Sequence, residues 1–187
     1  FVEIYNNTDT PHTVSDASGG YGLFKMGADC SASPVLIGVI PNGTIIPARG
    51  HYLFAGSAYS LANYGGSAAA AADQVLTQDI ESDRNVALFS TTSLVNLSTL
   101  TRLDAVGFGT NTTGVCDLLR EGTTLTPLNG TTLEHSYFRD ECGKAGNPAV
   151  FGICPTGGLV KDSNVNSVDF IFADTAGTLT PAGQRLG

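Results

Sequence analysis

Short apolar runs separated by turn residues dominate this sequence and restrict the chain to a fold built from strands. The first run, Phe1–Tyr5, is β-branched and aromatic, and it stops at a dense cluster of turn formers in residues 6–11. The amphipathic 3.6-residue period of a packed helix is almost absent. The further runs with strand character are Tyr21–Met26, Val35–Ile40, Thr44–Ile46, His51–Ala55, Val86–Phe89, Leu103–Phe108, Thr132–Arg139 and Val168–Ala173.

Turn signals separate most of these runs. The Pro41–Gly43 and Pro47–Gly50 turns, for example, bracket the short run at Thr44–Ile46. About nine short strands without interleaved helices favour an antiparallel sandwich over an α/β fold. We therefore predict an all-β protein, an antiparallel β-sandwich of about nine short strands with long loops, that forms a single domain over residues 1–187.

The charge composition argues against nucleic-acid binding and favours a location outside the cell. The chain carries 9 Lys and Arg against 17 Asp and Glu, a net charge of -8, and its basic residues are scattered singly. Only 14% of the residues are charged, so Ser, Thr, Asn and Gly make the surface polar. The most apolar stretch, Val35–Ile46, is interrupted by Gly and Pro and is too short to span a membrane. Because the chain opens on Phe1 without a charged leader, we expect a processed or partial product.

The four cysteines predict two disulfides in an oxidising compartment. They contain no C-x-x-C pair, and the three histidines lack the spacing of zinc ligands. Four cysteines allow three pairings, which the sequence does not distinguish. We favour Cys142 with Cys154, which closes a loop containing Gly and Pro and leaves Cys30 with Cys116.

Five N-x-[ST] triplets, the acceptor pattern for N-glycosylation, fall in turn-like or Thr-rich stretches. Sugars attached there would be exposed to solvent. Such triplets also arise by chance in a chain rich in Thr and Asn, and they matter only in a host with glycosylation machinery. The candidate acceptors are Asn6, Asn42, Asn96, Asn111 and Asn129.

The sequence lacks the common catalytic motifs, and we predict a non-catalytic protein. It contains no G-x-S-x-G, no H-E-x-x-H and no glycine-rich phosphate loop. Glu121 and Glu134 are candidates for an acid–base pair, but nothing in the sequence sets the distance between them.

One polar stretch, residues 162–169, has the spacing of a loop that binds a hard cation such as Ca²⁺. It places oxygen-bearing side chains at positions i, i+2, i+4 and i+7 but lacks the Gly and the later Glu of an EF-hand. The alternative is a series of Asx turns that lead the chain into the strand at Val168. The candidate metal ligands are Asp162, Asn164, Asn166 and Asp169.

Five segments, in this order, resemble the bacterial lamin-tail domain family. They are F-V-E-I-Y-N at 1–6, I-P-A-R-G-H-Y-L at 46–53, L-D-A-V-G-F-G at 103–109, D-S-N-V-N-S-V-D-F at 162–170 and T-P-A-G at 180–183. The resemblance implies an immunoglobulin-like β-sandwich, which agrees with the strand count reached independently. It also implies an exported, non-catalytic module that occurs alone or attached to secreted enzymes and surface proteins.

The sequence departs from this family in two places. The family usually has one strand before its F-[IV]-E-[IL]-[FY]-N segment and a Trp after the first turn, whereas this chain opens inside that segment and contains no Trp. A missing strand leaves an unpaired edge, which a strand from another chain is able to fill. A trimmed or disordered N-terminus is the alternative. The expected strand-exchange edge consists of Phe1, Val2, Glu3, Ile4 and Tyr5.

Three functional hypotheses follow. The first is an extracellular structural or interaction module, a surface or filament subunit joined by strand addition, with copies of itself or a cell-surface protein as partner. The second is an adhesion module that binds Ca²⁺ or carbohydrate. The third is an accessory domain of a secreted hydrolase.

Overall fold

Strands dominate the part of the chain that the structure describes. The structure is a computed structural model that describes residues 1–59, 71–109, 113–127, 135–139 and 162–174. Helical elements in these residues are two 3-10 turns, η1 (Leu94–Asn96) and η2 (Gly114–Leu119), and the short helix α1 (Asn166–Asp169). The strands are β1 (Val2–Tyr5), β2 (His12–Thr13), β3 (Gly20–Gly27), β4 (Val35–Pro41), β5 (Ile45–Ile46), β6 (His51–Ala55), β7 (Gln74–Val75), β8 (Arg84–Phe89), β9 (Arg102–Val106), β10 (His135–Arg139) and β11 (Phe170–Asp174).

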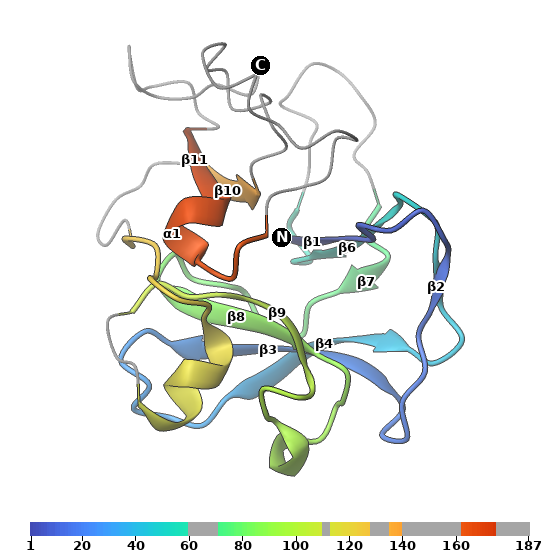
Figure 1. The fold of residues 1–187 in the computed structure, drawn as a ribbon, viewed down its shortest axis with the longest axis horizontal. Helices are drawn as coiled ribbons and strands as arrows, with labels where there is room; N and C mark the ends of the chain where they lie inside the picture. Colours follow the sequence, from blue (N-terminus) through green and yellow to red (C-terminus); the bar gives the residue numbers. More distant parts are fainter. Residues whose placement is uncertain (60–70, 110–112, 128–134, 140–161, 175–187) are drawn as a thin grey trace.

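An antiparallel four-stranded sheet, in the order β4-β3-β8-β9, forms the centre of the fold (Figure 1). Its inner strand β3 is buried along almost its whole length. Because side chains alternate along a strand, Leu23 points to one face of the sheet and Phe24 to the other. Leu88 and Phe89 of β8 divide in the same way. The central sheet therefore carries an apolar core on each face.

A smaller sheet, in the order β1-β6-β7, packs over the first of these cores. Phe54 of β6 is fully buried there, and Val2 and Ile4 of β1 pack against the same cluster. β1 pairs antiparallel with β6, whereas β7 pairs parallel with it. Just after β7, the amide of Thr77 donates to the carbonyl of Ile37 at 2.9 Å and links this layer to β4.

The second core is covered by η2, which a disulfide ties to the central sheet. Cys116 and Leu119 of η2 are fully buried in one cluster with Phe24 and Phe89, whose rings meet edge to face at 5.6 Å. Cys30, which follows β3, is bonded to Cys116, with their Cα atoms 5.6 Å apart. Figure 1 shows η2 as the yellow coil next to the central sheet.

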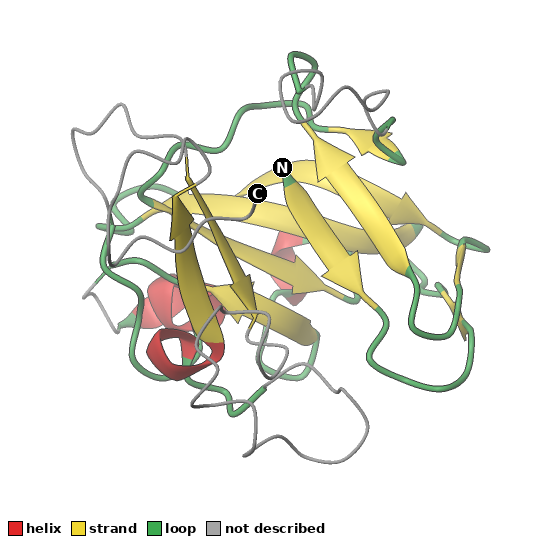
Figure 2. Cartoon of the chain, turned by 90° about the horizontal axis from the view of Figure 1, so that it is seen from above, coloured by secondary structure: helices red, strands yellow, loops and turns green. Residues whose placement is uncertain are grey.

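The strands β10 and β11 form a separate antiparallel pair. Figure 2 shows this pair apart from β1, which starts at the N-terminus. Aromatic rings join the pair to the segment after β9, since the centroid of the Tyr137 ring lies 5.1 Å from that of Phe108. Within the pair, the Tyr137 ring lies 5.6 Å from the ring of Phe172 on β11. The Tyr137 hydroxyl also donates to the Thr126 carbonyl at 3.0 Å.

The predicted all-β class is confirmed, and the described strands begin and end within about two residues of most expected runs. The structure adds the two-residue strands β2 and β7 and one parallel pair, which the sequence did not predict. It also corrects one boundary, because Val168 lies in α1 and the strand begins only at Phe170. Residues 132–134 of a further expected strand lie outside the described residues. The immunoglobulin-like strand order stays a prediction.

Candidate functional site

The outer edge of β1 is a candidate site for pairing with another chain. At the end of this strand the Asn6 amide donates to the Gly50 carbonyl at 2.9 Å, which continues the β1–β6 ladder. Since the direction of the backbone groups alternates along an antiparallel strand, those of Glu3 and Tyr5 point away from β6. Among the described residues, neither Glu3 nor Tyr5 has a hydrogen-bond partner for these outward backbone groups.

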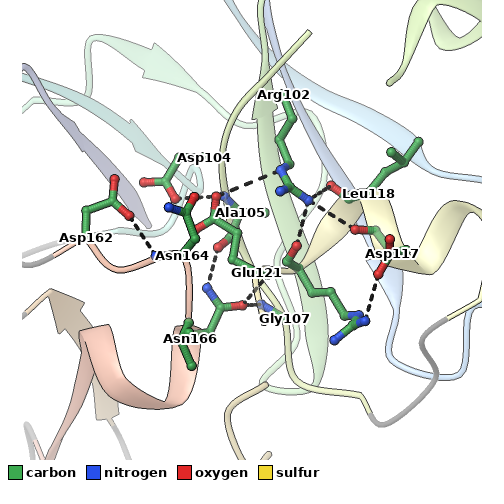
Figure 3. Close-up of polar contacts among 12 residues, drawn as sticks. Arg102, Asp104, Ala105, Gly107, Asp117, Leu118, Glu121, Asp162, Asn164 and Asn166 are labelled. Carbon is green, nitrogen blue, oxygen red and sulfur yellow. Dashed lines mark hydrogen bonds and ion pairs between the residues drawn. The ribbon is translucent and has the colours of Figure 1, made fainter. Parts of the chain in front are cut away.

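The edge of the central sheet at β9 is instead closed by one buried side chain. Asn166 is fully buried, its Nδ2 donates to the Ala105 carbonyl at 2.6 Å, and its Oδ1 accepts from the Gly107 amide at 2.9 Å (Figure 3). A neighbouring strand would use the same two backbone groups, so the side-chain amide takes the place of a peptide. Oδ1 also accepts from the Glu121 amide at 3.0 Å, which fixes the segment after η2 to the same edge.

The edge at β4 also has a bridging contact. Thr77 donates its amide and its hydroxyl to the carbonyl of Ile37, at 2.9 and 3.2 Å. Thus β9 and β4 both carry a bridge on their outer sides, while the outer side of β1 carries none within the described part of the chain. This difference leaves β1 more open to strand addition than β9 or β4.

Side chains hold β1 in place without covering its edge. Val2 and Ile4 pack into the first core, and Phe1 and Glu3 are exposed. The Glu3 carboxylate lies 2.9 Å from Nδ1 of His51 on the neighbouring strand β6. The expected edge residues are therefore brought together, with the side chains of Val2 and Ile4 turned inward and the backbone groups of Glu3 and Tyr5 facing outward.

A second polar assembly surrounds Arg139 at the end of β10. Its guanidinium contacts the carboxylate of Asp104, and it lies 3.5 Å from Glu121, 3.4 Å from Asp162 and 3.5 Å from Asp169. These groups come from β9, from the segment after η2 and from the loop that contains α1. We call them the Arg139 cluster; it ties the β10–β11 pair to the edge that Asn166 closes.

Glu121 is the least solvated carboxylate of the Arg139 cluster apart from Asp169. Its side chain is 6% exposed, and burial together with the nearby Asp104 charge raises the pKa of Glu121 to about 7. Arg139, and Arg102 at 3.9 Å, oppose this shift. Arg102 also donates to backbone carbonyls in the segment after β9, including that of Arg120 at 2.7 Å (Figure 3). Within the Arg139 cluster, Glu121 is therefore the carboxyl whose pKa lies near neutral pH.

The residues predicted to bind Ca²⁺ do not share one set of free oxygens. The Asp169 carboxylate accepts from the Ser163 amide at 2.9 Å and from the Val165 amide at 3.1 Å. Burial tends to raise the pKa of Asp169, but these bonds and Arg139 outweigh it and lower the pKa. Asn166 is used at the β9 edge, as described above.

The other two candidate ligands, Asp162 and Asn164, are exposed. The Asp162 carboxylate accepts from the Asn164 amide at 3.4 Å, and Asn164 has a positive φ of 58° (Figure 3). This geometry is that of an Asx turn, the alternative to a Ca²⁺-binding loop that the sequence left open. Among the described residues, no group of three or more His, Cys, Asp or Glu side chains is arranged to hold a metal ion.

The candidate glycosylation sites differ in accessibility. The Asn6 amide nitrogen, where a sugar would attach, donates to the Thr10 and Pro47 carbonyls at 2.9 Å and is part of a buried corner. Asn42 is exposed, although its side chain bonds to the backbone of Asp16. Asn96 is exposed on the loop after β8. The other acceptors, Asn111 and Asn129, lie outside the described residues.

Of the two expected disulfides, the structure contains the one between Cys30 and Cys116. Cys142 and Cys154 lie outside the described residues, as does Glu134, one of the two candidate acid–base carboxylates. The other, Glu121, is engaged with Arg139 as described above.

Comparison with known proteins provides no family for this chain. No protein-family model, no curated protein and no solved structure matches it. In the described residues, none of the helices is long and apolar enough to cross a membrane.

The sequence did not predict the Arg139 cluster or the role of Asn166. The residues of the cluster lie at positions 104, 121, 139, 162 and 169, and no regular spacing joins them. The density of Asp and Asn in residues 162–169 was the signal in this region, but it does not indicate which groups these side chains contact.

Proposed function

We propose that this chain is a non-catalytic extracellular module that assembles with other copies of itself, or with a cell-surface protein, by adding a strand to the outer edge of β1. The observation that carries the proposal is the set of outward backbone groups on Glu3 and Tyr5, which have no partner within the described residues. Such an edge is a template for a further strand. The buried disulfide, which suits an oxidising environment, supports the extracellular location.

We further propose that the chain is a lamin-tail domain. Its support is that segments carrying the resemblance contact one another although they lie far apart in the sequence. Asn6 of the first segment donates to the Ile46 and Pro47 carbonyls of the second. Asn166 of the fourth segment bonds to Ala105 and Gly107 of the third. The polar residues Asn6 and Asn166 thus join segments of the resemblance that are distant in the sequence.

Two variants at one position test the strand-addition proposal. Glu3→Pro removes the outward amide, a position where proline is tolerated because that amide makes no bond within the fold. Glu3→Ala removes the carboxylate contact with His51 but keeps the amide. We expect light scattering to give a mass well above 19.3 kDa for the wild type and for Glu3→Ala, and a monomer for folded Glu3→Pro. A wild type that is monomeric, or a Glu3→Pro variant that assembles like it, would contradict the proposal.

The measured mass also distinguishes two ways in which β1 could pair. Pairing of β1 with the same strand of a second copy is two-fold symmetric and stops at a dimer. Pairing with a different segment is head to tail and gives a closed ring or an open filament, which negative-stain microscopy of the same fraction would distinguish.

A further inference from the structure

A different surface of the molecule carries exposed aliphatic side chains on one short loop. Residues 90–101 connect β8 to β9 and contain η1. Leu94, Val95 and Leu100 on this loop are 51%, 90% and 94% exposed. In Figure 1 the loop projects with its green coil at the foot of the view, beyond the central sheet. We call these three residues the apolar tip.

The loop holds its conformation without these side chains. The Thr101 hydroxyl donates to the Asn96 carbonyl at 2.8 Å and accepts from the Ser98 amide at 3.0 Å. The Ser90 amide donates to the Thr101 carbonyl at 2.7 Å and closes the loop at its base. Leu97, by contrast, packs against the second core. The apolar tip is therefore presented on an ordered support, and its side chains are free to contact a partner.

We propose that the apolar tip inserts into the interfacial region of a zwitterionic lipid bilayer. Residues 90–101 include no charged and no aromatic side chain, whereas protein–protein hot spots are rich in Trp, Tyr and Arg and poor in Leu, Ser, Thr and Val. Three side chains also fall far short of the roughly 20–30 residues that each partner contributes to a stable protein interface. A lipid phase needs no complementary pocket and takes up aliphatic groups in proportion to their apolar area.

The charge of the molecule selects the type of bilayer. The chain has a net charge of -8, and residues 90–101 provide no Lys or Arg for an anionic headgroup. The next residue, Arg102, directs its guanidinium to the backbone carbonyls of Asp117 in η2 and of Arg120 just after it. An anionic surface therefore repels the protein, and insertion is driven by apolar burial alone. A single tip of this size binds reversibly, and several tips on one assembly bind more tightly.

The test uses the whole chain, unglycosylated because a sugar on Asn96 would keep the apolar tip out of the lipid, with vesicles of phosphatidylcholine. We expect the wild type to float with these vesicles and not with phosphatidylserine-rich ones. Val95→Ser combined with Leu100→Ser should weaken partitioning by roughly tenfold or more, because it removes most of the apolar area. The control, Ile45→Ser combined with Val75→Ser, changes exposed aliphatic residues of β5 and β7 and should bind like the wild type.

A fluorescence reporter gives an independent readout. Since the chain contains no Trp, Val95→Trp supplies a single indole whose emission should shift to the blue when phosphatidylcholine vesicles are added. The proposal fails if this emission stays at its value in water, if the tip and control variants bind equally, or if binding requires anionic lipid. It also fails if the wild type associates through the apolar tip in the absence of lipid, which would make a second copy the occupant.

Discussion

The Glu121 carboxyl should make the folded protein less stable as the pH rises through neutrality. Burial raises the pKa of Glu121 from 4.5 to about 7. Between these pH values the folded chain holds a proton that the unfolded chain has already lost, so unfolding releases a proton and the free energy of unfolding falls with rising pH. A shift of about 2.5 units corresponds to roughly 3 kcal/mol lost between about pH 4.5 and 8.

A Glu121→Gln variant removes this loss, because the neutral amide occupies the same place without titrating. Urea unfolding followed by circular dichroism gives the free energy of unfolding of both proteins at each pH. Most other titrating groups are shared by the two proteins and cancel, so the difference reports Glu121 together with its electrostatic coupling to the Asp104 carboxyl. We expect the free energy of the variant minus that of the wild type to grow by roughly 3 kcal/mol from about pH 5 to about pH 8.5.

Glu81→Gln is the matched control. Burial tends to raise the pKa of Glu81, but hydrogen bonds, including those from Arg84 and Lys25, outweigh it and lower the pKa. A carboxylate of this kind stabilises the folded state above its unfolded pKa, and the contribution is lost only in acid. This control variant should therefore be less stable than the wild type at neutral pH. If Glu121→Gln is also less stable at pH 8.5, the ion pairs with Arg139 and Arg102 outweigh burial and the reasoning is refuted.

Three further outcomes follow from the structure. Asn166→Ala leaves three backbone groups without partners and should lower the free energy of unfolding by about 3 kcal/mol or more, whereas a loss under about 1 kcal/mol in urea would refute its role as a strand substitute. Replacing Cys30 and Cys116 together by Ser removes a cross-link over 86 residues and should cost about 2–5 kcal/mol; equal urea midpoints for variant and wild type would exclude this contribution. EDTA should leave the melting temperature unchanged, because oxygens of Asn166 and Asp169 already accept protein hydrogen bonds. A melting temperature that rises with added Ca²⁺ would instead support Ca²⁺ binding at residues 162–169.

Much of the fold was predictable because its strands are local patterns. The β-branched and aromatic runs at Val35–Pro41 and His51–Ala55, with turn residues on both sides, indicate strands without knowledge of their neighbours. β2 and β7 were missed because two residues carry no period, and they exist only through pairing with β5 and β6.

The polar sites were far less predictable because they depend on tertiary contacts. Val168 has high strand propensity, yet it lies in α1, between the buried side chains of Asn166 and Asp169. The Asn166 side chain accepts a hydrogen bond from the distant Gly107 amide, and the Asp169 side chain accepts one from the Val165 amide in its own loop. These bonds fix the turn before the strand begins. In the same way, the elevated pKa of Glu121 arises from neighbours that the fold brings together. Sequence spacing contains none of this information.

Hydrogen exchange at the amides of Glu3 and Tyr5 tests the pairing of β1 with another chain most directly. Both amides point away from β6 and have no acceptor within the described residues, so in an isolated copy they should exchange rapidly. In the assembled fraction collected by size-exclusion chromatography, we predict slow exchange at both amides, with the Ile4 amide protected in either state. Rapid exchange at Glu3 and Tyr5 in the assembled fraction, or the lack of any assembled fraction, would contradict this prediction.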